Sequence, residues 1–182
     1  VTSLAAAFEP RHRGRMAPPR IETPGGVYHV NAKAVDGMNL FRDDVDRLEF
    51  LRRFGQEAAA SQLSILIYSL MTTHFHPLLR LTNPTLSSGF RGLNGLYAKA
   101  YNRRHERRGA LWQRRFYDTL IESDSHLFES IRHIARNAPR AHLVEAPEDW
   151  PWCNYGSAIG VQPRDPITDE RELLGLFGSQ AA

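Results

Sequence analysis

The pattern of apolar and polar residues predicts four short strands in this chain. Residues 27–35 follow a Pro-Gly-Gly breaker and alternate as a half-buried strand does. The apolar runs at 61–71 and 73–81 predict two further strands, joined by a tight link. Residues 110–123, ALWQRRFYDTLIES, predict a fourth strand or an extended hairpin arm.

Three longer segments place apolar residues at helical spacing. The first, over 43–60, spaces Val45, Leu48, Leu51 and Phe54 along one predicted face. The second follows turn residues after 83 and is predicted to end at Gly109. The third has Ser123 or Ser125 as its N-cap, and Pro139 should end it.

This order of elements, β-α-β-β-α-β-α, predicts an α+β fold. A hairpin between the second and third strands favours a ferredoxin-like antiparallel sheet with both major helices packed on one face. The length of 182 residues suits a single domain. We place this domain at 18–160, after a disordered basic extension at 1–17 and before a helical tail at 161–182 that packs on it.

The sequence argues against a membrane-spanning protein and a disulfide-stabilised one, and it indicates a cellular compartment. No run approaches the roughly 18–20 apolar residues that a membrane helix needs. The single cysteine, Cys153, excludes an internal disulfide framework. The N-terminal order, apolar before basic, is the reverse of a secretory signal, which predicts a cytoplasmic protein.

Positive charge is concentrated in one internal segment. Residues 99–115 hold seven Lys or Arg against one Glu, although the net charge of the chain is only +3. Aromatic rings among cations suit single-stranded nucleic acid, because bases stack while phosphates pair with the cations. The alternatives are a solvated helix face and, for Trp112, a place in the core. The candidate DNA-binding residues are Lys99, Arg103, Arg104, Arg107, Arg108, Trp112, Arg114 and Arg115.

Two histidines, His74 and His76, stand two residues apart in the third predicted strand. Alternate strand residues share a face, so both imidazoles project together while Phe75 points into the core. Two imidazoles on one face can chelate a divalent cation. The alternative is a pair of hydrogen-bonded core histidines.

The third predicted helix carries His133 and Asn137, four residues apart and therefore on one helical face. The side-chain carbonyl of Asn137 could bind a hard cation. The alternative for Asn137 is a C-terminal cap. The alternatives for His133 are a surface helix residue and a cation that interacts with the helix C-terminus.

These pieces together resemble the REP-associated tyrosine transposases, a branch of the single-tyrosine HUH transposases. The matching series runs from YSLMTTHFHPLLRL through GALWQRRF and SIRHIARNAPRA to DWPW, and the resemblance covers about residues 18–178. It implies the HUH transposase fold and a Mg²⁺ or Mn²⁺ ion bound by His74 and His76, with Asn137 completing the site. It also implies cleavage of single-stranded or hairpin DNA by a helix tyrosine, which becomes linked to the 5′ phosphate during DNA transposition.

Two positions depart from the family pattern. The pattern R-Y-I-x-x-N reads R-H-I-A-R-N here, so His133 stands where the family has its nucleophilic tyrosine, and Thr73 precedes His74 in place of asparagine. Histidine can attack phosphorus and form a phosphoramidate, although its ring is shorter than a phenol. Tyr97, Tyr101 and Tyr117 could substitute, but none lies one turn before Asn137.

Three hypotheses remain open from the sequence. The first is a metal-dependent transposase or strand-transfer nuclease with His133, or another tyrosine, as nucleophile. The second is a catalytically inactive DNA-binding derivative of the same family. The third is a small metal-dependent hydrolase or structural protein outside the family. The resemblance leaves monomer and homodimer open.

Overall fold

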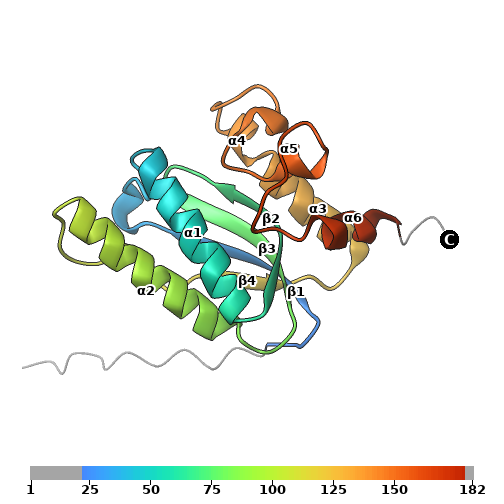
Figure 1. Cartoon of the computed structure of the whole chain (residues 1–182), viewed down its shortest axis with the longest axis horizontal. Coiled ribbons are helices and arrows are strands. Elements are labelled where there is room, and N and C mark those ends of the chain that lie inside the picture. Colours follow the sequence, from blue (N-terminus) through green and yellow to red (C-terminus); the bar gives the residue numbers. More distant parts are fainter. Residues whose placement is uncertain (1–21, 179–182) are drawn as a thin grey trace, which may run out of the picture.

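The computed structural model describes residues 22–178 and contains one four-stranded sheet in that part of the chain (Figure 1). The strands are β1 (Val27–Lys33), β2 (Leu63–Leu70), β3 (His74–Leu81) and β4 (Tyr117–Leu120). Their order is β2-β3-β1-β4, and each neighbouring pair is antiparallel. The predicted ferredoxin-like sheet is confirmed. The extension predicted at 1–17 lies outside the described residues.

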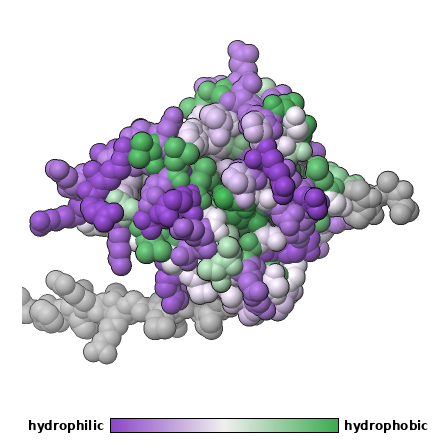
Figure 2. All heavy atoms as spheres, in the orientation of Figure 1, coloured by the Kyte–Doolittle hydropathy of each residue, from purple (hydrophilic) through white to green (hydrophobic). Residues whose placement is uncertain are grey.

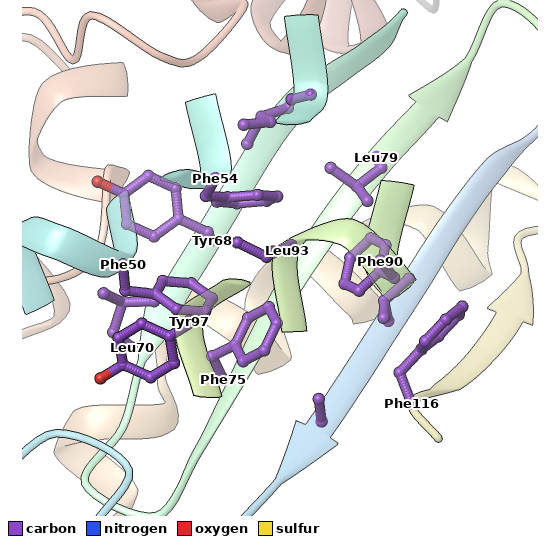
Figure 3. Close-up of a cluster of buried hydrophobic side chains, with 14 of the residues drawn as sticks. Phe50, Phe54, Tyr68, Leu70, Phe75, Leu79, Phe90, Leu93, Tyr97 and Phe116 are labelled. Atoms are coloured by element: carbon purple, nitrogen blue, oxygen red, sulfur yellow. The ribbon is translucent and has the colours of Figure 1, made fainter. Parts of the chain in front are cut away.

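Two long helices, α1 (Asp44–Ala60) and α2 (Leu86–Arg104), cover one face of the sheet side by side (Figure 1). Aromatic rings fill the space between them and the sheet (Figure 3). The ring centroids of Phe50 and Phe75 are 4.6 Å apart, and Phe75 stacks parallel to Phe90. Phe75 therefore points into this core, as the alternation of its strand predicts.

The buried face of α1 differs from the predicted one. Val45 and Leu48 are more than half exposed, whereas Asp46 is buried together with Phe50 and Phe54. A carboxylate can be buried here because it is paired: Asp46 accepts hydrogen bonds from the side chains of Arg104 and His105. Tertiary pairing thus outweighs the apolar pattern at the start of this helix.

The predicted end of the second helix and start of the fourth strand are wrong by several residues. Helix α2 ends at Arg104, because Glu106 takes a left-handed backbone conformation (φ 50°) and turns the chain away before Gly109. Residues 110–116 pair only locally with the end of β1, through backbone bonds such as Gln113 N–H to the Lys33 carbonyl. Regular pairing as β4 begins at Tyr117.

The opposite face of the sheet is covered by α3 (Asp124–Ala135). Apolar residues of α3 form a second core with β2 and β3: Leu127, Ile131 and Ile134 against Leu66, Ile67 and Leu78. Ser123 is the N-cap and accepts a hydrogen bond from the His126 N–H. The helix ends at Ala135, before the predicted stop at Pro139, and a separate turn, α4 (Asn137–Arg140), follows.

The C-terminal part of the chain covers the outer edge of β2. It contains α5 (Tyr155–Ala158), α6 (Glu170–Gly178) and a 3-10 turn at Pro147–Asp149. Another 3-10 turn, at Val35–Gly37, follows β1. Asn154 accepts from the Tyr68 N–H and donates to the Leu66 carbonyl, and the Trp150 indole donates to the Leu70 carbonyl. These bonds occupy backbone groups that would otherwise leave β2 an open edge. No helix in residues 22–178 is long and apolar enough to cross a membrane.

Candidate functional site

The histidine pair lies on the face of the sheet that α3 covers. His74 and His76 leave β3 on the side opposite to Phe75, and their ring centroids are 4.9 Å apart at an angle of 90°. His76 is only 5% exposed, and His74 is half-buried. The structure therefore brings the two imidazoles together on one face, as the strand spacing predicts.

One ring nitrogen of each histidine is already engaged. The Nδ1 atom of His74 is 3.1 Å from the Thr73 hydroxyl, and Nδ1 of His76 is 3.1 Å from Nε2 of His29. Such bonds to Nδ1 fix the orientation of an imidazole ring and the position of its proton. They leave Nε2 of both rings for an outside partner.

His29 belongs to this site, and the sequence reasoning missed it. It leaves β1 on the face opposite to its neighbours Tyr28 and Val30, which are buried in the aromatic core. The alternation of β1 could have placed His29 on that outer face. It could not show that β1 pairs with β3, 47 residues further along the chain, which is what brings His29 to His76.

His133 joins the site from α3. Its ring centroid is 5.4 Å from that of His76 and 5.8 Å from that of His29. Its Nδ1 atom lies 3.4 Å from the guanidinium of Arg140, on the short helix α4. The predicted nucleophile position therefore faces the predicted metal ligands across the space between helix and sheet.

All four imidazoles favour the neutral state. Burial, with help from neighbouring histidines, lowers the pKa of His76 to about 2 and that of His29 to about 4. Burial and the nearby Lys33 lower the pKa of His74 to about 4. Burial and Arg140 also lower the pKa of His133. Neutral imidazoles retain the lone pair that a metal ion or a phosphorus atom requires.

Asn137, the third predicted ligand, is the first residue of α4 and has no hydrogen bond to either histidine of β3. Its amide Nδ2 is buried without a hydrogen-bond partner among residues 22–178. A buried amide without a partner is costly, and an amide oxygen is a kind of ligand that a hard cation accepts.

No group of three His, Cys, Asp or Glu side chains within residues 22–178 is arranged to hold a metal ion. The cluster of His29, His76 and His133 is therefore not a preformed metal site. In it, Nε2 of His29 and Nδ1 of His76 already bond each other. A metal centre at this face would therefore depend on an oxygen ligand such as the amide of Asn137. Hard cations such as Mg²⁺ and Mn²⁺ accept that kind of ligand.

The tyrosines that could replace the family nucleophile lie in different places. Tyr97 and Tyr101 are buried under the opposite face of the sheet, where their hydroxyls donate to backbone carbonyls of Leu40 and Asn39. Neither can reach the histidines. Tyr117 of β4 pairs directly with Asn31 and so shares the sheet face of His29, and half of it is exposed.

The candidate DNA-binding arginines divide into two groups. Arg104 binds the carboxylates of Asp43 and Asp46 and joins the end of α2 to the start of α1. Arg107 donates to the Asn102 side chain at 3.0 Å and to the Ala110 carbonyl at 2.7 Å. Both guanidiniums hold the fold together, which reduces what they can offer to a phosphate.

The other cations of the segment are exposed and form no ion pair with any residue in 22–178: Lys99, Arg103, Arg108, Arg114 and Arg115. Arg114 lies over the ring of Tyr117 at 4.6 Å. Trp112 is half-buried against the aromatic core. Figure 2 shows hydrophilic side chains gathered where α2 ends, at the left of the view. This surface is suited to polyanion binding.

No family model matches the chain. A sequence relative and a solved structure nevertheless support the resemblance. A Haemophilus influenzae protein described as a "Putative REP-associated tyrosine transposase" is 35% identical over 54 residues. That match covers 30% of this chain and 31% of the relative, so less than a third of the relative's length is spanned.

One solved structure extends the similarity to the whole fold. A REP-associated tyrosine transposase bound to a REP hairpin superposes with a TM-score of 0.68 at 18% identity, over 85% of this chain and 94% of that one. A protein described as a "putative transposase" from Deinococcus radiodurans matches with a TM-score of 0.46 at 16% identity, over 68% of this chain and 96% of that one. The chain thus has the fold of a REP-associated tyrosine transposase and a segment similar in sequence to another, which confirms the resemblance that its motifs indicate.

Proposed function

We propose that this protein binds single-stranded or hairpin DNA as a transposase does and presents a phosphodiester to the histidine face for metal-dependent cleavage and strand transfer. The observation that carries the proposal is the approach of His133 to His76, at 5.4 Å between ring centroids, in a fold shared with a REP-associated transposase. That neighbour is described as bound to a REP hairpin, which supports the same class of ligand here.

The metal ligands in this proposal are Nε2 of His74, Nε2 of His76 and the amide oxygen of Asn137. Their support is the free nitrogen on each oriented ring and the unpartnered buried amide. A Mg²⁺ or Mn²⁺ ion held there would polarise the scissile phosphodiester as a Lewis acid. Thr73 and His29 would keep the two rings in their ligating orientation.

His133 would supply the covalent step. A lone pair of its neutral ring forms a bond to phosphorus while the bond from phosphorus to the 3′ oxygen breaks. The proton on the other ring nitrogen passes to the released oxygen, which leaves a 5′ phosphoramidate and a free 3′ hydroxyl. Strand transfer is the reverse reaction with a different 3′ hydroxyl, so no outside reagent is consumed.

A cleavage assay on labelled hairpin DNA with Mn²⁺ or Mg²⁺ tests this function. We expect a covalent protein–DNA adduct on denaturing gels with the wild type and none with His133→Ala. A phosphoramidate should be lost in acid, whereas the His133→Tyr adduct should survive it. If the wild type yields neither a strand break nor an adduct with either metal, the cleavage function is refuted.

A second candidate, DNA binding without cleavage, is favoured by the contact between Arg140 and His133. A guanidinium can only donate, so this contact puts the lone pair on Nδ1 and the proton on Nε2 of His133. In that tautomer the Nε2–H would donate to a phosphate oxygen and could not attack phosphorus. Wild-type binding without cleavage, together with an adduct formed by His133→Tyr, would establish this second function.

A further inference from the structure

A small cavity opens at the β4 edge of the sheet, away from the histidines. It has a volume of about 270 Å³ and lies between α2 and the segment that leads into β4. Pockets for whole drug-sized ligands usually begin at about 300 Å³, so this one suits a single planar ring system. The proposed function does not use it.

Aromatic rings form the walls of the cavity. Phe90 of α2 and Phe116 are buried with ring centroids 4.7 Å apart, and both can be seen in Figure 3. Trp112 completes the lining, and its indole N–H donates to the Asn94 backbone carbonyl at 2.8 Å. This bond holds the indole in place, so a ring that stacks on it would not have to order it first.

Polar groups of two kinds accompany these rings. Arg91, Arg114 and Arg115 line the cavity, are exposed, and form no ion pair with any residue from 22 to 178. The side-chain oxygen of Asn94, another lining residue, is buried and accepts no hydrogen bond from any part of the chain that the structure describes. A buried acceptor without a donor is costly, and an N–H group of a ligand would relieve that cost.

We propose that this cavity binds one unpaired nucleobase of the DNA, stacked on Trp112, with its phosphate held by the arginines. The ligand would be a base with an exocyclic amino group, since that group can donate to the Asn94 oxygen. An acidic peptide would use the arginines but would leave the aromatic walls and the Asn94 oxygen without a partner. The inference rests on the proposed DNA binding and adds a base-binding subsite to it.

Abasic scanning of the hairpin ligand tests the subsite. Each unpaired nucleotide is replaced in turn by an abasic one, and the affinity of the wild type is measured. We expect one position to lose about tenfold in affinity, since stacking of a base on an aromatic ring contributes free energy of that order. Loss of one base at a position outside the cavity should change little.

A filled cavity provides the matching protein variant. Ser87 lines the cavity on α2, so Ser87→Trp should occupy it and abolish the effect of the sensitive abasic position. The next residue, Ser88, is exposed and does not line the cavity. Ser88→Trp is therefore the control, and it should keep the loss of affinity at the sensitive abasic position. Thermal melting of both variants verifies that they fold.

The outcomes separate the two proposals. If the wild type binds hairpins but no abasic position matters, or if Ser87→Trp keeps the sensitive position, the base-binding subsite is refuted and DNA binding stands. Equal losses at every abasic position would mean that no single base is bound in a pocket of its own and would also refute it. A wild type that binds no hairpin at all refutes both.

Discussion

His29 is the residue that orients His76, because its Nε2 atom is bonded to the His76 Nδ1 atom at 3.1 Å. In the proposed metal site His76 would bind the cation through Nε2, its Nδ1 would carry a proton, and His29 is placed to accept that proton. Loss of such an outer partner typically weakens metal binding by about 10–100-fold. The site therefore extends beyond the residues that carry the family motif.

We expect His29→Ala to weaken Mn²⁺ binding by about tenfold or more without preventing folding. Titration calorimetry on the DNA-free protein measures this affinity. His126→Ala is the matched control, because His126 is another half-buried histidine at this face but has no side-chain bond to the pair. Equal affinities for the wild type and His29→Ala would show that His29 does not position the ligand.

The basic segment, residues 99–115, runs from the end of α2 to the start of β4. Some of its cations stabilise the fold, and the others are exposed and available to a ligand. Arg104 and Arg107 are tied to α1 and to the turn after α2, while the other cations project from the surface. A cation that already has a carboxylate partner gains less from a phosphate than a free one, since the existing partner must be displaced. The exposed group is therefore the one to test for DNA binding.

Replacement of Arg103, Arg108, Arg114 and Arg115 by alanine should weaken binding to any single strand and flatten its salt dependence. For a single strand, the slope of log affinity against log salt concentration is about −0.7 for each phosphate that the protein neutralises. Each lost arginine contact should therefore make this slope shallower by about 0.7. Fluorescence anisotropy at several salt concentrations measures both quantities. Arg104→Ala is the contrasting variant, and we expect it to lower the melting temperature, because Asp46 is left buried without that partner.

The segment that covers the edge of β2 contributes directly to stability. Asn154 is 2% exposed and satisfies one N–H and one carbonyl of β2. We expect Asn154→Ala to lower the free energy of unfolding by about 1–3 kcal/mol, since two buried backbone groups lose their partner. Urea denaturation measures the change, with the exposed Asn83→Ala as control; a change below about 0.5 kcal/mol, typical of surface sites, would contradict this role.

The neutral histidines link the stability of the whole molecule to pH. His29 and His74 have pKa values lowered from 6.5 to about 4, chiefly by burial, with Lys33 and neighbouring histidines adding to the effect. Between these values the unfolded chain takes up protons that the folded chain does not. The free energy of unfolding therefore falls as the pH drops from about 6.5 to about 4.

We expect the melting temperature of the metal-free protein, measured with a chelator present, to fall steadily from pH 7 to pH 4.5. Replacement of His29 by glutamine should make that fall smaller, because one of the depressed groups is gone. Asp43 contributes little in this range, since its hydrogen bond to Arg104 lowers its pKa from 3.8 to about 2 and both values lie below pH 4.5. A melting temperature that rises or stays constant on acidification would contradict the assignment.

Much of the fold could be predicted from the sequence because periodicity is a local property. The two runs that become β2 and β3 are apolar and bounded by turns, and α3 begins at Ser123, one of its two predicted caps. The buried face of α1 could not be predicted, because Asp46 is buried by partners about 60 residues away on α2. The shared face of His74 and His76 was predictable, because it follows from strand geometry alone.

The amino-acid pattern alone specifies the type and order of the main elements, the histidine pair on one face of a strand, and the absence of a tyrosine at position 133. The position of α3 on the face opposite to α1 and α2, the approach of His29 and His133 to His76, and the internal pairing of Arg104 depend on the assembled fold. This difference follows from the range of the interactions. Backbone geometry and side-chain alternation act over a few residues, whereas these contacts join segments that come together only when the sheet assembles.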